Sequence, residues 1–141
     1  MEIDAKEQDR RRKLLAAHYA AENKHDLDGV MHTFSGETEM IYNGQRFADD
    51  ASIRWAHGYI GFSDAPGAFA GIRTERDHEH FTAEEIVVEG RLCGKHVGEF
   101  QGYAPTQRDV ELPFVGFYRF DAGGKLVSER IVMNLGVLGA S

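Results

Sequence analysis

The half of the chain from residue 72 to residue 135 has the sequence pattern of β-strands joined by short turns. Apolar and polar residues alternate along it, and turn residues interrupt the alternation at short intervals. Strands that follow one another through short turns pair antiparallel, whereas parallel strands need a long crossover. The pattern therefore predicts an antiparallel sheet with a turn at Glu89-Gly90 and with strands at residues 72–89, 91–103, 109–120 and 125–135.

Helical patterns are confined to the first sixty residues. Between residues 4 and 23 apolar side chains recur every three or four positions, which predicts a long amphipathic helix. Two shorter helices are expected after Asp26 and after Asp49 or Asp50, because aspartate is a preferred N-cap residue.

Residues 37–48 switch to alternation and contain the tight-turn signal Asn43-Gly44, which predicts a short hairpin. Helices that precede hairpin-linked strands cover one face of the sheet, which is the α+β class. We therefore expect one domain over residues 1–141: a cone-shaped barrel in which a curved antiparallel sheet wraps around the long N-terminal helix, with two shorter helices, and encloses an apolar cavity.

Charge and composition exclude several partners. Lysine and arginine number 16 against 23 aspartates and glutamates, and the net charge of -7 repels a phosphate backbone, so we expect no nucleic acid partner. The chain has no stretch approaching the ~18 apolar residues of a membrane span and no signal-peptide core, so we expect no membrane partner and a cytoplasmic protein. The single cysteine, Cys93, is expected to be a buried thiol.

Three stretches resemble the nuclear transport factor 2-like superfamily. Residues 18–34, HYAAENKHDLDGVMHTF, are similar to its first helix pair. Residues 94–120, in which glycines alternate with larger residues before the segment VELP, resemble its SnoaL-like polyketide cyclase branch, and residues 124–130 are similar to the last strand of that branch. The resemblance implies a cone-shaped barrel with an apolar pocket at its wide mouth, packed as a homodimer through the open face of the sheet.

The resemblance also allows known chemistries of the superfamily to be compared with the residues present. Positions that match the catalytic groups of ketosteroid isomerase are Tyr42, His18 and Gly116, so its two carboxylates are missing. The position that matches the aspartate of limonene epoxide hydrolase and of the cyclases is Ile131, which cannot move a proton. Scytalone dehydratase uses a tyrosine and a histidine at positions that match Tyr42 and His80, and this partial match favours elimination or enolisation.

Tyr42 and His80 are accordingly the first catalytic candidates. A histidine with a pKa near ~6.5 can both take and give a proton at neutral pH, and a phenol on the opposite wall can hold an oxyanion. The alternative is that His78 and His80, which share a strand face, lie on the rim or outside of the sheet among charged neighbours.

Glu129 is the third catalytic candidate. Alternation places it on the face of Ile131 and Met133, which is expected to line the cavity. A carboxylate buried among apolar groups has a raised pKa and can serve as a general acid or base. The alternative is an ordinary salt bridge with Arg119 or Arg130.

Further side chains are expected to contact the ligand, although each is also compatible with a plain core or structural role. They are His18, Met40, Trp55, His96, Phe114, Tyr118, Ile131, Met133 and Asn134. The histidines expected to be surface or structural residues are His25, His32 and His57.

We expect no metal and no cofactor. His78-x-His80 followed by Glu84 or Glu85 is similar to the first metal box of cupins, but cupins need a further histidine on a later strand, and none occurs after His96. The chain also contains no P-loop, dinucleotide-binding glycine pattern, nucleophile elbow or Cys-x-x-Cys motif.

These features predict an enzyme that binds a small, largely apolar, carbonyl-bearing molecule and moves a proton on it by isomerisation, cyclisation or elimination. The alternative is a non-catalytic module of the same fold that holds a hydrophobic ligand or dimerises, and a third class is a protein-interaction role. Two or more titratable side chains converging on one point of a cavity favour catalysis, whereas an apolar wall favours binding alone.

Overall fold

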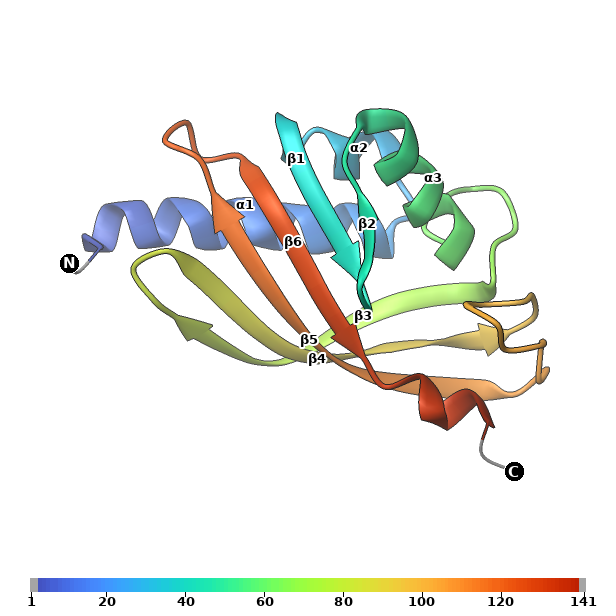
Figure 1. Ribbon diagram of the computed structural model, residues 1–141. Coiled ribbons are helices and arrows are strands. Elements are labelled where there is room, and N and C mark those ends of the chain that lie inside the picture. The colour runs from blue at the N-terminus through green and yellow to red at the C-terminus, as the bar shows by residue number, and fades with distance from the viewer. Residues whose placement is uncertain (1–2, 140–141) are drawn as a thin grey trace.

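The computed structural model describes residues 3–139 as a curved six-stranded sheet with helices packed against one side (Figure 1). The helix α1 runs along the sheet, and α2 and α3 lie near β1 and β2. The elements are α1 (Ala5–Asn23), α2 (Leu27–Met31), β1 (Phe34–Tyr42), β2 (Gln45–Phe47), α3 (Asp50–Ile60), β3 (Phe69–Phe81), β4 (Glu85–His96), β5 (Asp109–Phe120), β6 (Leu126–Met133) and the 3-10 helix η1 (Leu135–Gly139). The predicted α+β architecture with a long first helix is confirmed.

The strands follow the order β2-β1-β6-β5-β4-β3 across the sheet. Strands joined by hairpins pair antiparallel, as expected, but β1 and β6 pair parallel and make the sheet mixed. No hairpin joins these two strands, because β1 and β6 are far apart in the chain. Their register sets Met40 opposite Glu129 and Tyr42 opposite Ile131, which brings these side chains to one region.

The two expected N-caps are present, and α1 has a third at Asp4. Asp4 accepts a hydrogen bond from the backbone of Glu7, and Asp26 accepts one from the backbone of Gly29. Asp49, rather than Asp50, caps α3 in a capping box with Ser52. These caps satisfy backbone N–H groups that have no partner within the helix, so they set where each helix begins.

The prediction of a turn at Glu89-Gly90 is wrong. Both residues lie inside β4, and the chain reverses direction at residues 82–84. A Cβ atom on Gly90 would lie 2.4 Å from the carbonyl oxygen of Glu75 and 2.9 Å from the ring of Phe114. This glycine therefore permits close packing inside the sheet, a role that glycine has in strands as well as in turns.

The core lies between the sheet and α1. Even-numbered side chains of β5, such as Leu112 and Tyr118, are buried on the face where Leu15 and Tyr19 of α1 pack, and odd-numbered ones point to the opposite face. Cys93 is buried, as expected. Within residues 3–139, every helix is too short or too polar to cross a lipid bilayer.

Candidate active site

The helix α1 presents two ionisable side chains on its buried stripe. Leu15, His18, Tyr19 and Glu22 follow one another at helical spacing and are all buried. His18 is 0% and Glu22 is 3% exposed, which is unusual for such groups unless they are paired.

Two further ionisable side chains reach the same place from α3 and from β6. His57 and Glu129 are 0% and 1% exposed. The Nε2 atom of His18 lies 3.4 Å from Oε2 of Glu22 and 3.7 Å from Oε1 of Glu129, and Nε2 of His57 lies 3.5 Å from Oε2 of Glu22. We call these four residues the buried polar cluster.

The other ring nitrogen of each histidine has a partner that sets its protonation. Nδ1 of His57 lies 2.9 Å from the carbonyl oxygen of Ile53, which can only accept, so Nδ1 carries the hydrogen. The Thr33 hydroxyl donates to the carbonyl of Val30 at 2.6 Å, so it accepts from Nδ1–H of His18 at 2.8 Å. Both imidazoles therefore turn Nε2 toward the carboxylates of the cluster.

A small cavity of about 10 Å³ adjoins the cluster. Tyr42 and Tyr118 line it together with Glu22 and Glu129, and the rest of its wall is apolar. The hydroxyl groups of Tyr19 and Tyr118 are in hydrogen-bonding contact. The cavity holds roughly one water molecule, so a larger ligand has to displace side chains of the wall.

The cluster perturbs its own protonation equilibria. Burial alone lowers the pKa of His18, but the carboxylates of Glu22 and Glu129 outweigh it and raise that pKa to about 10. The pKa of His57 is raised for the same reason, against the effect of burial. Burial raises the pKa of Glu22, but the imidazoles of His18 and His57 prevail and bring it to about 2. Burial raises the pKa of Tyr42 well above its usual value, and the nearby carboxylates of Glu129 and Glu22 raise it further. This phenol therefore keeps its proton and remains a hydrogen-bond donor.

These shifts predict how stability depends on pH. The interactions with Glu22 and Glu129 that raise the pKa of His18 also stabilise the fold. Their contribution is complete below pH 6.5 and is lost as the pH rises through about 10. The interactions with His18 and His57 that lower the pKa of Glu22 stabilise the fold above pH 4.5. Their contribution is lost as the pH falls through about 2. We expect the free energy of unfolding, measured by urea titration with EDTA present, to be greatest between pH 4.5 and 6.5. A free energy that increases from neutral to alkaline pH would contradict this assignment, and His18→Asn should flatten the alkaline decline.

Glu129 and Tyr42, two of the three catalytic candidates, lie at the cavity, but His80 does not. The expectation that His80 faces the cavity is wrong: its side chain is 58% exposed, and its Nε2 atom lies 2.7 Å from Oε2 of Glu89 on the outside of the sheet. The alternative partners of Glu129 are also excluded, because Arg119 pairs with Glu84 and Arg130 lies over the ring of Phe117.

The expected ligand-contacting residues divide into two groups. Phe114, Tyr118, Ile131 and Met133 line the cavity, and His18 belongs to the cluster beside it. The remaining four lie elsewhere: Met40 is packed in the core, His96 is buried against Phe69 and Thr106, Trp55 is 57% exposed and stacks on Tyr59, and Asn134 is exposed and accepts from the backbone of Gly136.

Trp55 and Asn134 were expected to face the interior and do not, for two physical reasons. The apolar stripe of α3 runs through Ile53, Ala56 and Ile60, and Trp55 lies outside it. Asn134 follows Met133, which points inward, so alternation turns the amide outward.

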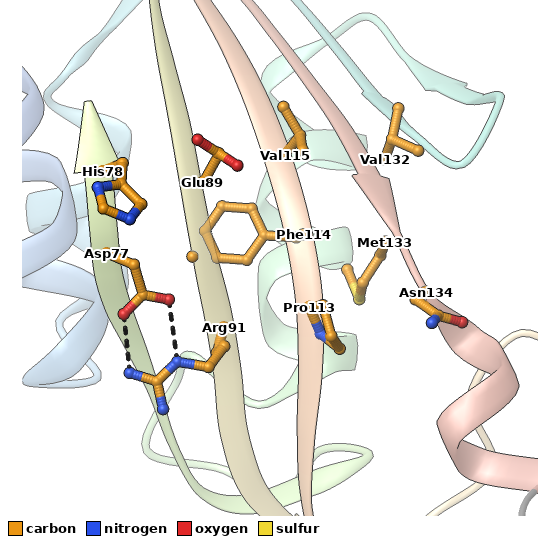
Figure 2. A pocket seen from close by; sticks show the side chains of 11 residues that line it. Asp77, His78, Glu89, Arg91, Pro113, Phe114, Val115, Val132, Met133 and Asn134 are labelled. Atoms are coloured by element: carbon orange, nitrogen blue, oxygen red, sulfur yellow. Dashed lines mark hydrogen bonds and ion pairs between the residues drawn. The ribbon is translucent and has the colours of Figure 1, made fainter. Parts of the chain in front are cut away.

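A hollow of about 880 Å³ lies on the other face of the sheet, away from the helices. In Figure 2 Asp77 and Arg91 form two hydrogen bonds, each 3.0 Å long, beside the apolar side chains of Pro113, Val115 and Val132. Its ionisable side chains are open to solvent, and Asp77 pairs with Arg91 and Glu89 with His80. The buried, strongly interacting ionisable groups are therefore found at the small cavity and not in this hollow.

Glu22 and His57 are the members of the cluster that sequence reasoning missed. His57 was expected to be a surface or structural residue, but it is fully buried in the cluster. A signal was present in both cases: Glu22 continues the buried stripe of α1, and His57 lies on the apolar stripe of α3 with Ile53 and Ile60.

The match to known families agrees with this fold. The family model of SnoaL-like polyketide cyclase matches residues 12–139, so this chain belongs to the SnoaL-like polyketide cyclase family. The resemblance expected from the sequence is thereby confirmed. Among curated proteins, no sequence gives a significant match.

Solved structures of several relatives share the fold. AclR from Streptomyces galilaeus, provisionally assigned as a hydroxylase, has a TM-score of 0.73 and 24% identity, covering 91% of each chain. A provisionally assigned SnoaL-like polyketide cyclase from Jannaschia sp. CCS1 has a TM-score of 0.76 and 16% identity, covering 94% of this chain and 93% of that one. SalBIII, an epoxide hydrolase/cyclase-like enzyme of pyran ring formation in the polyether salinomycin, has a TM-score of 0.75 and 15% identity, covering 92% of this chain and 95% of its own.

Proposed function

We propose that this protein is an enzyme that moves a proton on a small, largely apolar, carbonyl-bearing molecule, by isomerisation, cyclisation or elimination. One observation carries the proposal: the buried side chains of Glu22, Glu129 and Tyr42 line one small cavity, next to two buried imidazoles. Convergent titratable groups in a water-poor cavity are the arrangement that proton-transfer catalysis requires.

The roles follow from position and hydrogen-bonding capacity. Glu129 takes a proton from the carbon next to the carbonyl and returns it at a new position, or to a leaving hydroxyl group. The Tyr42 phenol donates a hydrogen bond to the oxygen on which negative charge develops. His18 lies between Glu129 and Glu22 and holds both carboxylates in place.

Ligand entry requires movement, because a space of about 10 Å³ does not hold such a molecule. The residues that have to move are apolar side chains of the cavity wall, Phe62, Leu92 and Met133 among them. Closing such a wall over the ligand excludes water and strengthens every electrostatic interaction inside.

The hollow of about 880 Å³ on the open face of the sheet favours a second candidate function, a non-catalytic module that holds a hydrophobic ligand or dimerises. Val132 is 52% exposed in the hollow on the open face of the sheet, beside Val115. We include in the proposal a homodimer formed through this face, which the resemblance to the superfamily implies.

The first function predicts a large effect of Glu129→Gln. With a panel of aromatic and steroidal ketones in deuterated water, the wild-type protein should exchange hydrogen at the carbon next to the carbonyl. Glu129→Gln should slow this exchange by about 10²- to 10⁴-fold, because the amide cannot accept the proton. NMR spectroscopy of the ketones measures the rate.

The matched control is Glu89→Gln, the same substitution at the exposed partner of His80, and it should leave the exchange rate unchanged. Circular dichroism verifies that both variants are folded. Equal rates for the wild type and Glu129→Gln would contradict the assignment of Glu129. Ketone binding without any exchange would support the non-catalytic module instead.

A further inference from the structure

We propose that His18, Glu22, His57 and Glu129 form a binding site for one divalent transition-metal ion. This inference goes beyond the proposed function and does not depend on it, because an ion can bind here whether or not a substrate is converted. It also departs from the expectation of a metal-free protein, which considered only His78 and His80 with Glu84 or Glu85 as ligands.

The spacing of the ligand atoms fits a tetrahedral ion. One nitrogen or oxygen atom of each residue lies within 4.8 Å of those of the other three. A tetrahedral ion with bonds of about 2.0–2.1 Å holds neighbouring ligand atoms about 3.3 Å apart. The three measured pairs are separated by 3.4, 3.5 and 3.7 Å and lie close to this value, whereas the other pairs, at up to 4.8 Å, have to close further when the ion binds.

Polar atoms of the cluster lack hydrogen-bond partners even though they are buried. Among residues 3–139, Nε2 of His18, Nε2 of His57 and Oε2 of Glu129 have none. Such orphaned buried atoms are rare in folded proteins. The exposed pair of His80 and Glu89, in contrast, is joined by an ordinary hydrogen bond of 2.7 Å. The cluster atoms lie 3.4–3.7 Å apart, at the distance of ion pairs and close to the spacing of ligands around one ion.

The surrounding residues orient both imidazoles as metal ligands. Because Thr33 and the carbonyl of Ile53 accept from the Nδ1–H groups, the Nε2 atoms present lone pairs to the cluster when the rings are neutral. Histidine ligands in metal sites are fixed by this kind of second hydrogen bond. His18 and Glu22 are also one helical turn apart on α1, so one rigid element positions two ligands.

Charge and ligand type select the class of ion. Two carboxylates and two neutral imidazoles around a divalent ion form an electrically neutral buried group, which avoids the cost of an uncompensated charge. Two nitrogen and two oxygen ligands suit Zn²⁺ or Co²⁺. Ca²⁺ and Mg²⁺ prefer sites made of oxygen ligands alone, so they should bind weakly here.

Direct binding to the full-length protein tests the proposal. After treatment with EDTA and desalting, the protein should bind one equivalent of Zn²⁺ by calorimetry, and Co²⁺ should give the intense visible absorption of a four-coordinate ion. Mg²⁺ and Ca²⁺ should not compete. Absence of saturable Zn²⁺ binding by the wild-type protein would overturn the proposal, and it would leave the proton-transfer function to be judged by ketone exchange.

Variants locate the ion. Glu129→Gln and His57→Gln should each weaken Zn²⁺ binding by about 100-fold or more, since loss of a supporting residue alone costs 10- to 100-fold. The matched controls Glu89→Gln and His80→Gln, at the exposed pair, should bind as the wild type does.

A measurement on the wild type keeps the test decisive if a cluster variant fails to fold. In a long-range ¹H–¹⁵N spectrum of the imidazoles, Zn²⁺ should shift the Nε2 resonances of His18 and His57 and leave the other histidines unchanged. A shift confined to His78 and His80 would show binding at the surface and overturn the proposed site.

Discussion

Replacing Glu22 with glutamine is expected to lower the free energy of unfolding by about 3–5 kcal/mol, because it removes one partner from a buried group of charges. The Glu22 carboxylate lies 3.4 Å from Nε2 of His18 and 3.5 Å from Nε2 of His57, and it accepts from the hydroxyl of Thr74. Both imidazoles would then keep only Glu129 to balance their charge. Urea or guanidinium unfolding at pH 6 in EDTA measures the change.

The control for Glu22→Gln is again Glu89→Gln. Glu89 and His80 are both more than half exposed, so their pair should contribute at most about 1 kcal/mol. If Glu22→Gln lowers the free energy of unfolding no more than Glu89→Gln does, charge interactions do not hold the cluster together. Removing His57 together with Glu22 should cost less than the sum of the two single changes, because the two side chains interact directly.

Gly90→Ala is expected to destabilise the protein by about 2–3 kcal/mol, at the upper end of the usual cost of overpacking. The added methyl group would lie 2.4 Å from the carbonyl oxygen of Glu75, a backbone atom that cannot rotate away, and 2.9 Å from the Phe114 ring. Thermal and denaturant unfolding measure the effect.

Gly36→Ala supplies the comparison, because nothing lies within 4 Å of the position where its Cβ would be. We expect a change within about 0.5 kcal/mol there. If Gly90→Ala changed the free energy of unfolding as little as Gly36→Ala, there would be room for a Cβ atom at Gly90. Close packing would then not explain the glycine inside β4.

The elements of the fold could be predicted because they depend on local patterns. Helical spacing in residues 4–23, aspartates at the starts of the two shorter helices and Asn43-Gly44 between two strands each act over a few neighbouring residues. Gly90 could not be interpreted in this way. Glycine marks both turns and close packing, and only its neighbour across the sheet, Glu75, distinguishes the two roles.

His80 shows why alternation alone is insufficient to place a site. Ile72 and Thr74 of β3 point inward, and unbroken alternation would turn His80 inward as well. The pairing with β4 shifts between Arg76 and His78, where a bulge adds one residue to β3. The bulge reverses the two faces for the rest of the strand, so His80 lies outside opposite Val87.

The sequence by itself determined the class of fold, the family and the inward position of Glu129, because periodicity and alternation are properties of neighbouring residues. Only the tertiary structure decided which ionisable groups meet. Glu22, His57 and Glu129 come from two helices and a strand that the parallel pairing of β1 with β6 and the packing of α1 bring together. These contacts join residues more than a hundred positions apart in the chain, such as His18 and Glu129, and no local pattern specifies them.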